Sequence, residues 1–145
     1  MADHDERWIL NHLIEMCRDE EQLLRYAADH VEQASAKALF VELAADRARF
    51  ANDLLPHAQR LGGGDAANST TRGRLYRGWM ALKDTVLGHS DKRVITDAER
   101  AEAFALARYE EALNKLLPPS ARDVVEDQSS QIRRAHERAQ AFLTH

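Results

Sequence analysis

The chain has 145 residues, a length typical of one domain, and its 20 Lys and Arg against 24 Asp and Glu give a net charge of −4 at pH 7. This acidic balance argues against a broad basic surface for nucleic acid or anionic lipid, and no apolar run approaches the roughly 18 residues of a membrane span. The single cysteine, Cys17, excludes an internal disulfide, and the residues after Met1 lack the basic and apolar segments of a signal peptide. We therefore expect one cytoplasmic domain over residues 1–145, with neither nucleic acid nor a membrane as partner.

Apolar residues recur every three or four positions over two long segments in the first half of the chain, as on one face of an amphipathic helix. The first segment covers residues 8–31 and the second covers residues 36–61. Gly62 is a suitable residue to end the second helix. The short link between the segments predicts an antiparallel hairpin.

A second pair of helices is predicted in the last third of the chain. One stripe lies within residues 95–116 and stops at Pro118-Pro119, and the other lies within residues 125–143, with Ser120 as the expected N-cap. Between the hairpins, residues from about 62 to 92 form a long connection that includes a short amphipathic segment, 75–86.

The composition favours helix throughout, because Ala, Leu, Glu and Arg are abundant and no β-branched run is long enough for a strand. We predict an all-α fold: a ferritin-like four-helix bundle of two antiparallel hairpins, with a long crossover that contains a short helix. The alternative is an interaction module of helical repeats. The absence of a shared motif in the two hairpins argues against it, since repeat arrays normally need about three units.

The apolar stripe of each long helix is interrupted near its middle by polar residues. In an antiparallel hairpin, residues at equal distance from the turn lie at equal height, so these interruptions are expected to meet. A bundle with such interruptions has a polar layer across its centre. The expected members of this layer are Glu20, Arg47, Glu99, Glu102, Gln128 and His136.

Four-helix bundles build di-iron and di-manganese sites at this height, from one Glu on each of two helices and a Glu-x-x-His on each of the other two. That ligand set is incomplete here, because position 133 is Arg and the second helix offers Arg47 in place of the motif. A guanidinium is a permanent cation that can take the place of a metal ion among carboxylates. We expect no catalytic residue and no cofactor, with iron or manganese as the alternative. The cluster expected to hold a divalent ion, weakly, is Glu99, Glu102 and His136.

Other interpretations of these residues stay open. Glu20, which is followed by Glu21, could belong to a solvated acidic face, and His136 could be a boundary residue hydrogen-bonded to a neighbour. Tyr109 is interpreted as packing at the edge of the core, and Cys17 as chemically inert among apolar neighbours.

Segments spread over nearly the whole chain carry a resemblance: Leu10–Glu15, Leu43–Phe50, Leu75–Lys83, Glu99–Glu102, Tyr109–Leu113 and the His-Glu-Arg motif at 136–138. They resemble a bacterial family of uncharacterised ferritin-like four-helix-bundle proteins, whose marks are Arg47, the Arg-Gly-Trp motif at 77–79 and the Glu-x-x-Glu motif. The resemblance implies the fold and no particular activity. The chain departs from the family at Glu20, where members usually have a small residue, and at Tyr76, where they have His. The first departure weakens Glu20 as a family-wide ligand, and the second removes a possible crossover ligand.

The leading functional hypothesis is a non-enzymatic bundle with an internal Arg-carboxylate network, acting as a stress-related or scaffold protein and forming a dimer or small oligomer. The densely charged outer positions argue against a hollow cage, which needs contacts on several faces. The alternative is a carboxylate-bridged iron or manganese protein for oxidation or metal storage.

Overall fold

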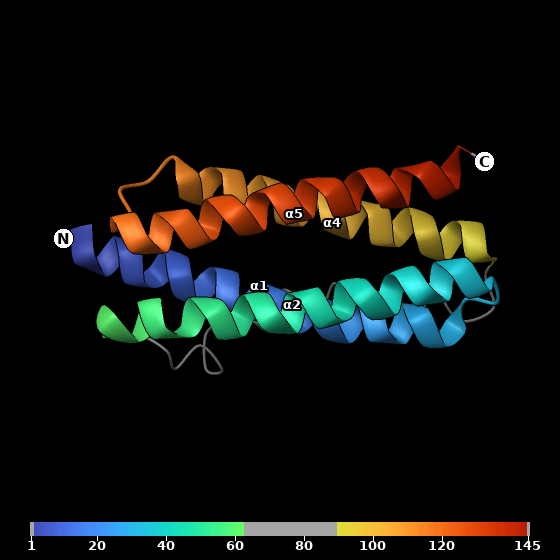
Figure 1. Ribbon diagram of the computed structural model, residues 1–145, viewed down its shortest axis with the longest axis horizontal. Helices are drawn as coiled ribbons and strands as arrows, with labels where there is room; N and C mark the ends of the chain where they lie inside the picture. Colours follow the sequence, from blue (N-terminus) through green and yellow to red (C-terminus); the bar gives the residue numbers. More distant parts are fainter. Residues whose placement is uncertain (1, 63–89, 145) are drawn as a thin grey trace.

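The computed structural model describes residues 2–62 and 90–144, and within these ranges the chain forms four α-helices and no strand. The helices are α1 (Ala2–His30), α2 (Ala34–Arg60), α4 (Asp91–Leu113) and α5 (Pro119–Leu143). α1 pairs with α2 and α4 pairs with α5, while α1 also contacts α4 and α2 also contacts α5 (Figure 1). This closed ring of neighbours is a four-helix bundle, as the sequence predicts.

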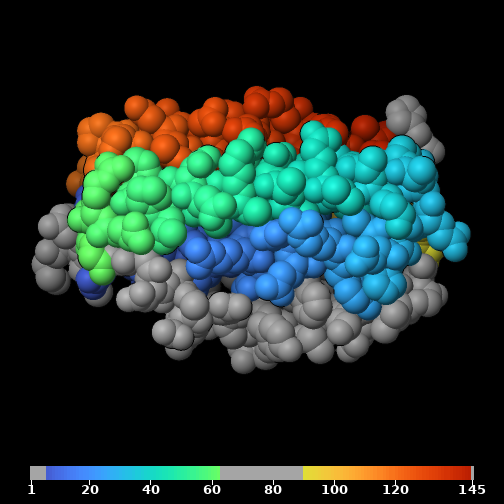
Figure 2. Space-filling view, turned by 60° about the horizontal axis from the view of Figure 1, so that its bottom comes forward, coloured from blue at the N-terminus to red at the C-terminus, as the bar shows by residue number. Residues whose placement is uncertain are grey.

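Neighbouring helices run antiparallel, whereas the diagonal pairs α1/α5 and α2/α4 run parallel (Figure 1). α2 consequently ends at the end of the bundle opposite to the start of α4. The space-filling view shows α2 lying between α1 and α5 (Figure 2). The crossover expected at about 62–92, with its short helix at 75–86, lies outside the described residues except at its ends.

Several helix ends differ from the sequence prediction. Helix α1 begins at Ala2 and not near residue 8, and the starts of α4 and α5 also differ. Helix α5 begins at Pro119, with Pro118 as N-cap, so the predicted N-cap at Ser120 is wrong. Proline is well suited to the first helical position because its φ is already helical and its missing N–H would have no partner there. Helix α4 begins earlier than predicted, because Ser90 caps it by accepting a hydrogen bond at Oγ from the backbone N–H of Arg93, 3.4 Å away.

The first residue of α4 ties the two hairpins together at one end of the bundle. The carboxylate of Asp91 accepts hydrogen bonds from the backbone N–H groups of Glu32 (2.9 Å) and Gln33 (2.7 Å), which form the turn between α1 and α2. At the other end of α2, Gly62 adopts a left-handed φ of 85°, which confirms the expected helix stop there.

Buried apolar side chains form two clusters along the bundle axis. One cluster includes Leu13, Phe50, Leu54, Val125 and Ile132. The other includes Leu24, Phe40, Leu43, Val94 and Ile95. Glu20, Arg47, Glu99 and Glu102 lie where their helices pass from one cluster to the other, whereas Gln128 lies within the first cluster, between Val125 and Ile132.

Helix α4 packs through smaller residues than the sequence stripe suggests. Ala98, Ala105 and Ala112 are buried, whereas the predicted core residue Leu116 is 81% exposed. Leu116 lies beyond the end of α4, so the helical period no longer sets its direction. No described helix combines the length and the apolar composition that crossing a membrane requires.

Candidate functional site

The centre of the bundle holds a buried arginine from the middle of α2. Arg47 is 1% exposed, and its Nε donates a hydrogen bond to Oε1 of Glu20 at 3.0 Å. Its Nη2 donates to Oε2 of Glu102. These three side chains, Glu20 from α1, Arg47 from α2 and Glu102 from α4, are called the ionic layer below. The layer joins three helices, including the diagonal pair α2 and α4.

The ionic layer contains two carboxyl groups and one guanidinium in a site almost without water. Burial raises the pKa of Glu20 to about 8 and also raises the pKa of Glu102 above its ordinary value. Burial alone would lower the pKa of Arg47, but the facing carboxylates of Glu102 and Glu20 outweigh it and hold the pKa above its usual range. Burial thus favours the uncharged form of both carboxyl groups, while the Arg47 guanidinium favours their charged form.

A second polar chain crosses the core one turn away from the ionic layer. Tyr109 donates its hydroxyl hydrogen to Oε1 of Gln128 at 2.7 Å, and Nε2 of Gln128 donates to the backbone carbonyl of Phe50 at 3.2 Å. Because the only hydroxyl hydrogen of Tyr109 is used in this way, the thiol of Cys17, 3.2 Å away, is the donor to the tyrosine oxygen. All four helices therefore contribute to one satisfied hydrogen-bond chain.

The groups of this second chain are unreactive at neutral pH. Burial raises the pKa of the Cys17 thiol to about 12 and the pKa of Tyr109 well above its ordinary value. Both side chains are fully buried, and both stay protonated. Cys17 is thus held as a neutral hydrogen-bond donor rather than as a nucleophile.

The three residues expected to hold a divalent ion take part in two separate interactions. Nε2 of His136 on α5 lies 2.5 Å from Oε1 of Glu99 on α4, and these two side chains are 19% and 18% exposed. Glu102 is directed to Arg47 instead. Among the side chains that the structure describes, those of residues 6–62 and 90–144, no group of three or more His, Cys, Asp or Glu is placed to hold a metal ion.

The structure thus places Glu20, Arg47, Glu102 and Gln128 in the buried core and Glu99 with His136 nearer its edge. Sequence reasoning missed the role of Tyr109, which is not packing at the core edge but fully buried and hydrogen-bonded at the centre. Tyr109 lies in the apolar stripe of α4, at the same distance from Pro118-Pro119 as Gln128 on α5. This spacing could have predicted their contact. Glu15 is also buried, and nothing in the α1 stripe indicates it.

Residues 6–115 match the model of a family described as Domain of unknown function (DUF2383), which is well over half of the chain. The chain belongs to this family. The matched region contains the whole ionic layer, with Glu20, Arg47 and Glu102, and ends before α5, which carries Gln128 and His136. A search of the curated proteins found no match.

Proposed function

We propose that this protein is a ferritin-like bundle without a catalytic metal centre, whose Arg-carboxylate layer is structural and whose function is that of a scaffold or stress-related interaction protein in the bacterial cytoplasm. The observation that carries the proposal is the position of the Arg47 guanidinium between Glu20 and Glu102. This is the height at which ferritin-like bundles hold metal ions.

The charge and geometry of Arg47 support a structural role. A di-metal centre needs carboxylates free to bridge two cations, and Arg47 occupies one carboxylate from α1 and one from α4. A divalent ion beside the guanidinium would also meet a like charge in a site of low dielectric constant. The residues of the ionic layer therefore do not fit a carboxylate-bridged centre while Arg47 is in place.

The rest of the central layer also favours a non-enzymatic role. Catalysis by a nucleophile needs a group whose pKa is lowered, or a base within hydrogen-bond reach. Burial raises the pKa of both Cys17 and Tyr109, and their polar atoms are already used within the core. The central polar groups thus serve to fix the register of the helices.

The charged outer surface argues against a closed cage, and the assembly we propose is a dimer or small oligomer. Ion pairs between exposed side chains cover α2 and α5, such as Arg138 with Glu42, at 3.0 and 2.8 Å, and Arg49 with Asp46, at 3.1 Å. A large apolar contact area on several faces is what a closed cage requires, and charged faces oppose it.

Metal analysis of the protein purified without chelator tests the proposal. We expect less than about 0.1 equivalent of iron or manganese, and no oxo-iron absorption after aerobic addition of Fe(II). Arg47→Gln serves as the comparison, because it removes the cation and leaves both carboxyl groups in place. About two equivalents of metal in the native protein, with an oxo-iron band, would overturn the proposal.

A carboxylate-bridged iron or manganese protein is the second candidate. It is favoured by the concentration of carboxylates at one height, with the Glu99–His136 pair close enough to Glu102 to influence its charge. The same experiment separates the two functions, because only the second predicts native metal bound in stoichiometric amount.

A further inference from the structure

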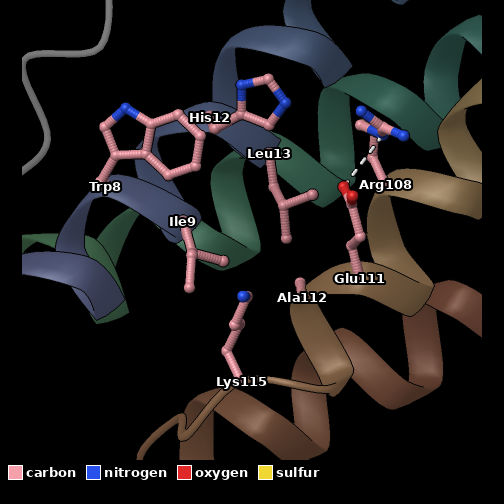
Figure 3. Close-up of a pocket in the computed structure, with 8 residues that line it drawn as sticks. All are labelled: Trp8, Ile9, His12, Leu13, Arg108, Glu111, Ala112 and Lys115. Atoms are coloured by element: carbon pink, nitrogen blue, oxygen red, sulfur yellow. Dashed lines mark ion pairs between the residues drawn. The ribbon is translucent and has the colours of Figure 1, made fainter. Parts of the chain in front are cut away.

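A cavity of about 320 Å³ lies between α1 and α4, near the start of α1 and the end of α4 (Figure 3). It is separate from the ionic layer. Its lining consists of Trp8, Ile9, His12 and Leu13 from α1, Arg108, Glu111 and Ala112 from α4, and Lys115, which lies just after the end of α4. The volume lies at the lower limit of the roughly 300–1,000 Å³ typical of ligand sites, so an occupant must be small.

The α1 side of the cavity offers a flat aromatic wall above an apolar floor. The indole of Trp8 and the imidazole of His12 stack with their centroids 5.2 Å apart and their planes 8° from parallel. Ile9, Leu13 and Ala112 are buried and form the floor. Trp8 nevertheless remains 55% exposed, which leaves much of its ring available for stacking.

The α4 side supplies an excess of positive charge. Arg108 pairs with Glu111, with 3.3 Å between Nε and Oε2. Lys115 has no ion-pair partner among the described residues, and its side chain extends toward Ile9 and Ala112 (Figure 3). Among the described lining residues, the cations Arg108 and Lys115 against the single anion Glu111 give an excess of one positive charge.

We propose that this cavity binds a small aromatic carboxylate, whose ring lies on the apolar floor beside Trp8 and whose anionic group pairs with Lys115. The aromatic wall selects for a planar ring, because stacked or edge-to-face aromatic contacts add to the burial of apolar area. The excess positive charge favours a monoanion, because a carboxylate gains an ion pair with the Lys115 ammonium that a neutral ligand does not form. Ligand binding in this cavity is a second function, in addition to the structural role proposed for the core.

Isothermal titration calorimetry of the full chain with naphthalene-1-carboxylate tests this site. Two further ligands separate its two requirements: naphthalene-1-carboxamide keeps the rings without the charge, and cyclohexanecarboxylate keeps the charge without an aromatic ring. The variants are Trp8→Leu and Lys115→Gln, with Lys92→Gln as the matched control, since Lys92 is an exposed lysine at the other end of α4. Substitutions at exposed positions leave the fold intact.

We expect naphthalene-1-carboxylate to bind the native chain and Lys92→Gln equally, and each of the two cavity variants about tenfold more weakly. Both comparison ligands should bind the native chain at least about tenfold more weakly. Absence of binding to the native chain, equal binding by Lys115→Gln, or equal binding of the carboxamide would overturn the proposal. A lower sedimentation coefficient of Trp8→Leu without ligand would also overturn it, because the face would then be a contact between two copies of the chain.

Discussion

Replacing Arg47 by methionine removes the only cation of the ionic layer while keeping a long apolar side chain in the same space. The side chain of Arg47 is 1% exposed and hydrogen-bonded to both Glu20 and Glu102. The variant therefore leaves two carboxyl groups buried without their donor. The protein must then either keep a buried charge unpaired or protonate both carboxyl groups.

Loss of one partner from a buried ion pair costs about 3–5 kcal/mol, whereas an apolar replacement of the whole network is often neutral or stabilising. We expect Arg47→Met to lower the free energy of unfolding by about 3–5 kcal/mol, a large fraction of the roughly 5–15 kcal/mol typical of a domain. Combining it with Glu20→Leu and Glu102→Leu should restore the stability to within about 1 kcal/mol of the native value.

Urea unfolding followed by circular dichroism measures these differences, and Arg49→Met is the matched control. The guanidinium carbon of Arg49 lies 5.2 Å from the centroid of the Phe50 ring, and that of Arg47 lies 5.6 Å from the same centroid. Arg49 is exposed, however, and its ion pair with Asp46 is accessible to water. We expect its replacement to cost less than about 1 kcal/mol. A loss below about 0.5 kcal/mol in Arg47→Met, the size expected for a surface substitution, would show that the buried ion pairs of Arg47 do not stabilise the bundle.

Burial raises the pKa of Glu20 to about 8 from 4.5, so the folded state keeps a proton that the unfolded chain releases, and the free energy of unfolding should fall as the pH rises from about 4.5 to about 8. Urea titrations across this pH range check the slope, and Glu20→Gln should flatten it; a rise in stability with pH over this range would contradict the assignment. Tyr109→Phe should cost about 1–3 kcal/mol in the same assay, because Gln128 loses a buried donor, and an unchanged stability would exclude the hydrogen-bond chain as a stabilising element. Light scattering should report a dimer or small oligomer, and a species above about eight subunits would argue for a cage. Calorimetric titration with Mn(II) should show at most weak binding that Glu102→Gln leaves unchanged, because Glu102 pairs with Arg47 and not with Glu99 and His136, and tight binding by the native chain would exclude a metal-free layer.

The polar layer could be predicted from the sequence because it follows from the helical repeat and from antiparallel pairing of the helices. The helical repeat places Glu20, Arg47 and Glu102 in the apolar stripes, and antiparallel pairing places residues at equal distance from a turn at one height. Glu20 and Arg47 meet for this reason, since α1 and α2 are joined by a short link.

The partners of each polar residue could not be assigned in the same way. Glu99 and Glu102 share a helix face, but a difference of about one turn sends Glu102 to Arg47 and Glu99 to His136. The contact between Cys17 and Tyr109 depends on α1 lying beside α4, which the sequence periodicity does not reveal. An apolar stripe shows which face of a helix is buried. The residues that contact this face are known only once the arrangement of the helices is known.

The N-terminal ends of the later helices depend on capping rather than on apolar periodicity. Ser90 starts α4 before its first apolar residue, and Pro119 starts α5 one residue before the expected cap. Leu116 continues the numerical spacing of α4 but lies past the point where that helix ends. Local chemistry at helix ends thus overrides a pattern counted from the helix middle.

We propose that the Arg47 guanidinium, and not a metal ion, neutralises carboxylate charge at the middle of the bundle. An anomalous difference map from crystals of the native protein grown with excess Mn(II) tests this directly. We expect the guanidinium between Glu20 and Glu102, with no anomalous peak within the ionic layer. A manganese peak bound by either carboxylate, with Arg47 turned away from it, would show that a metal ion takes the place of the guanidinium.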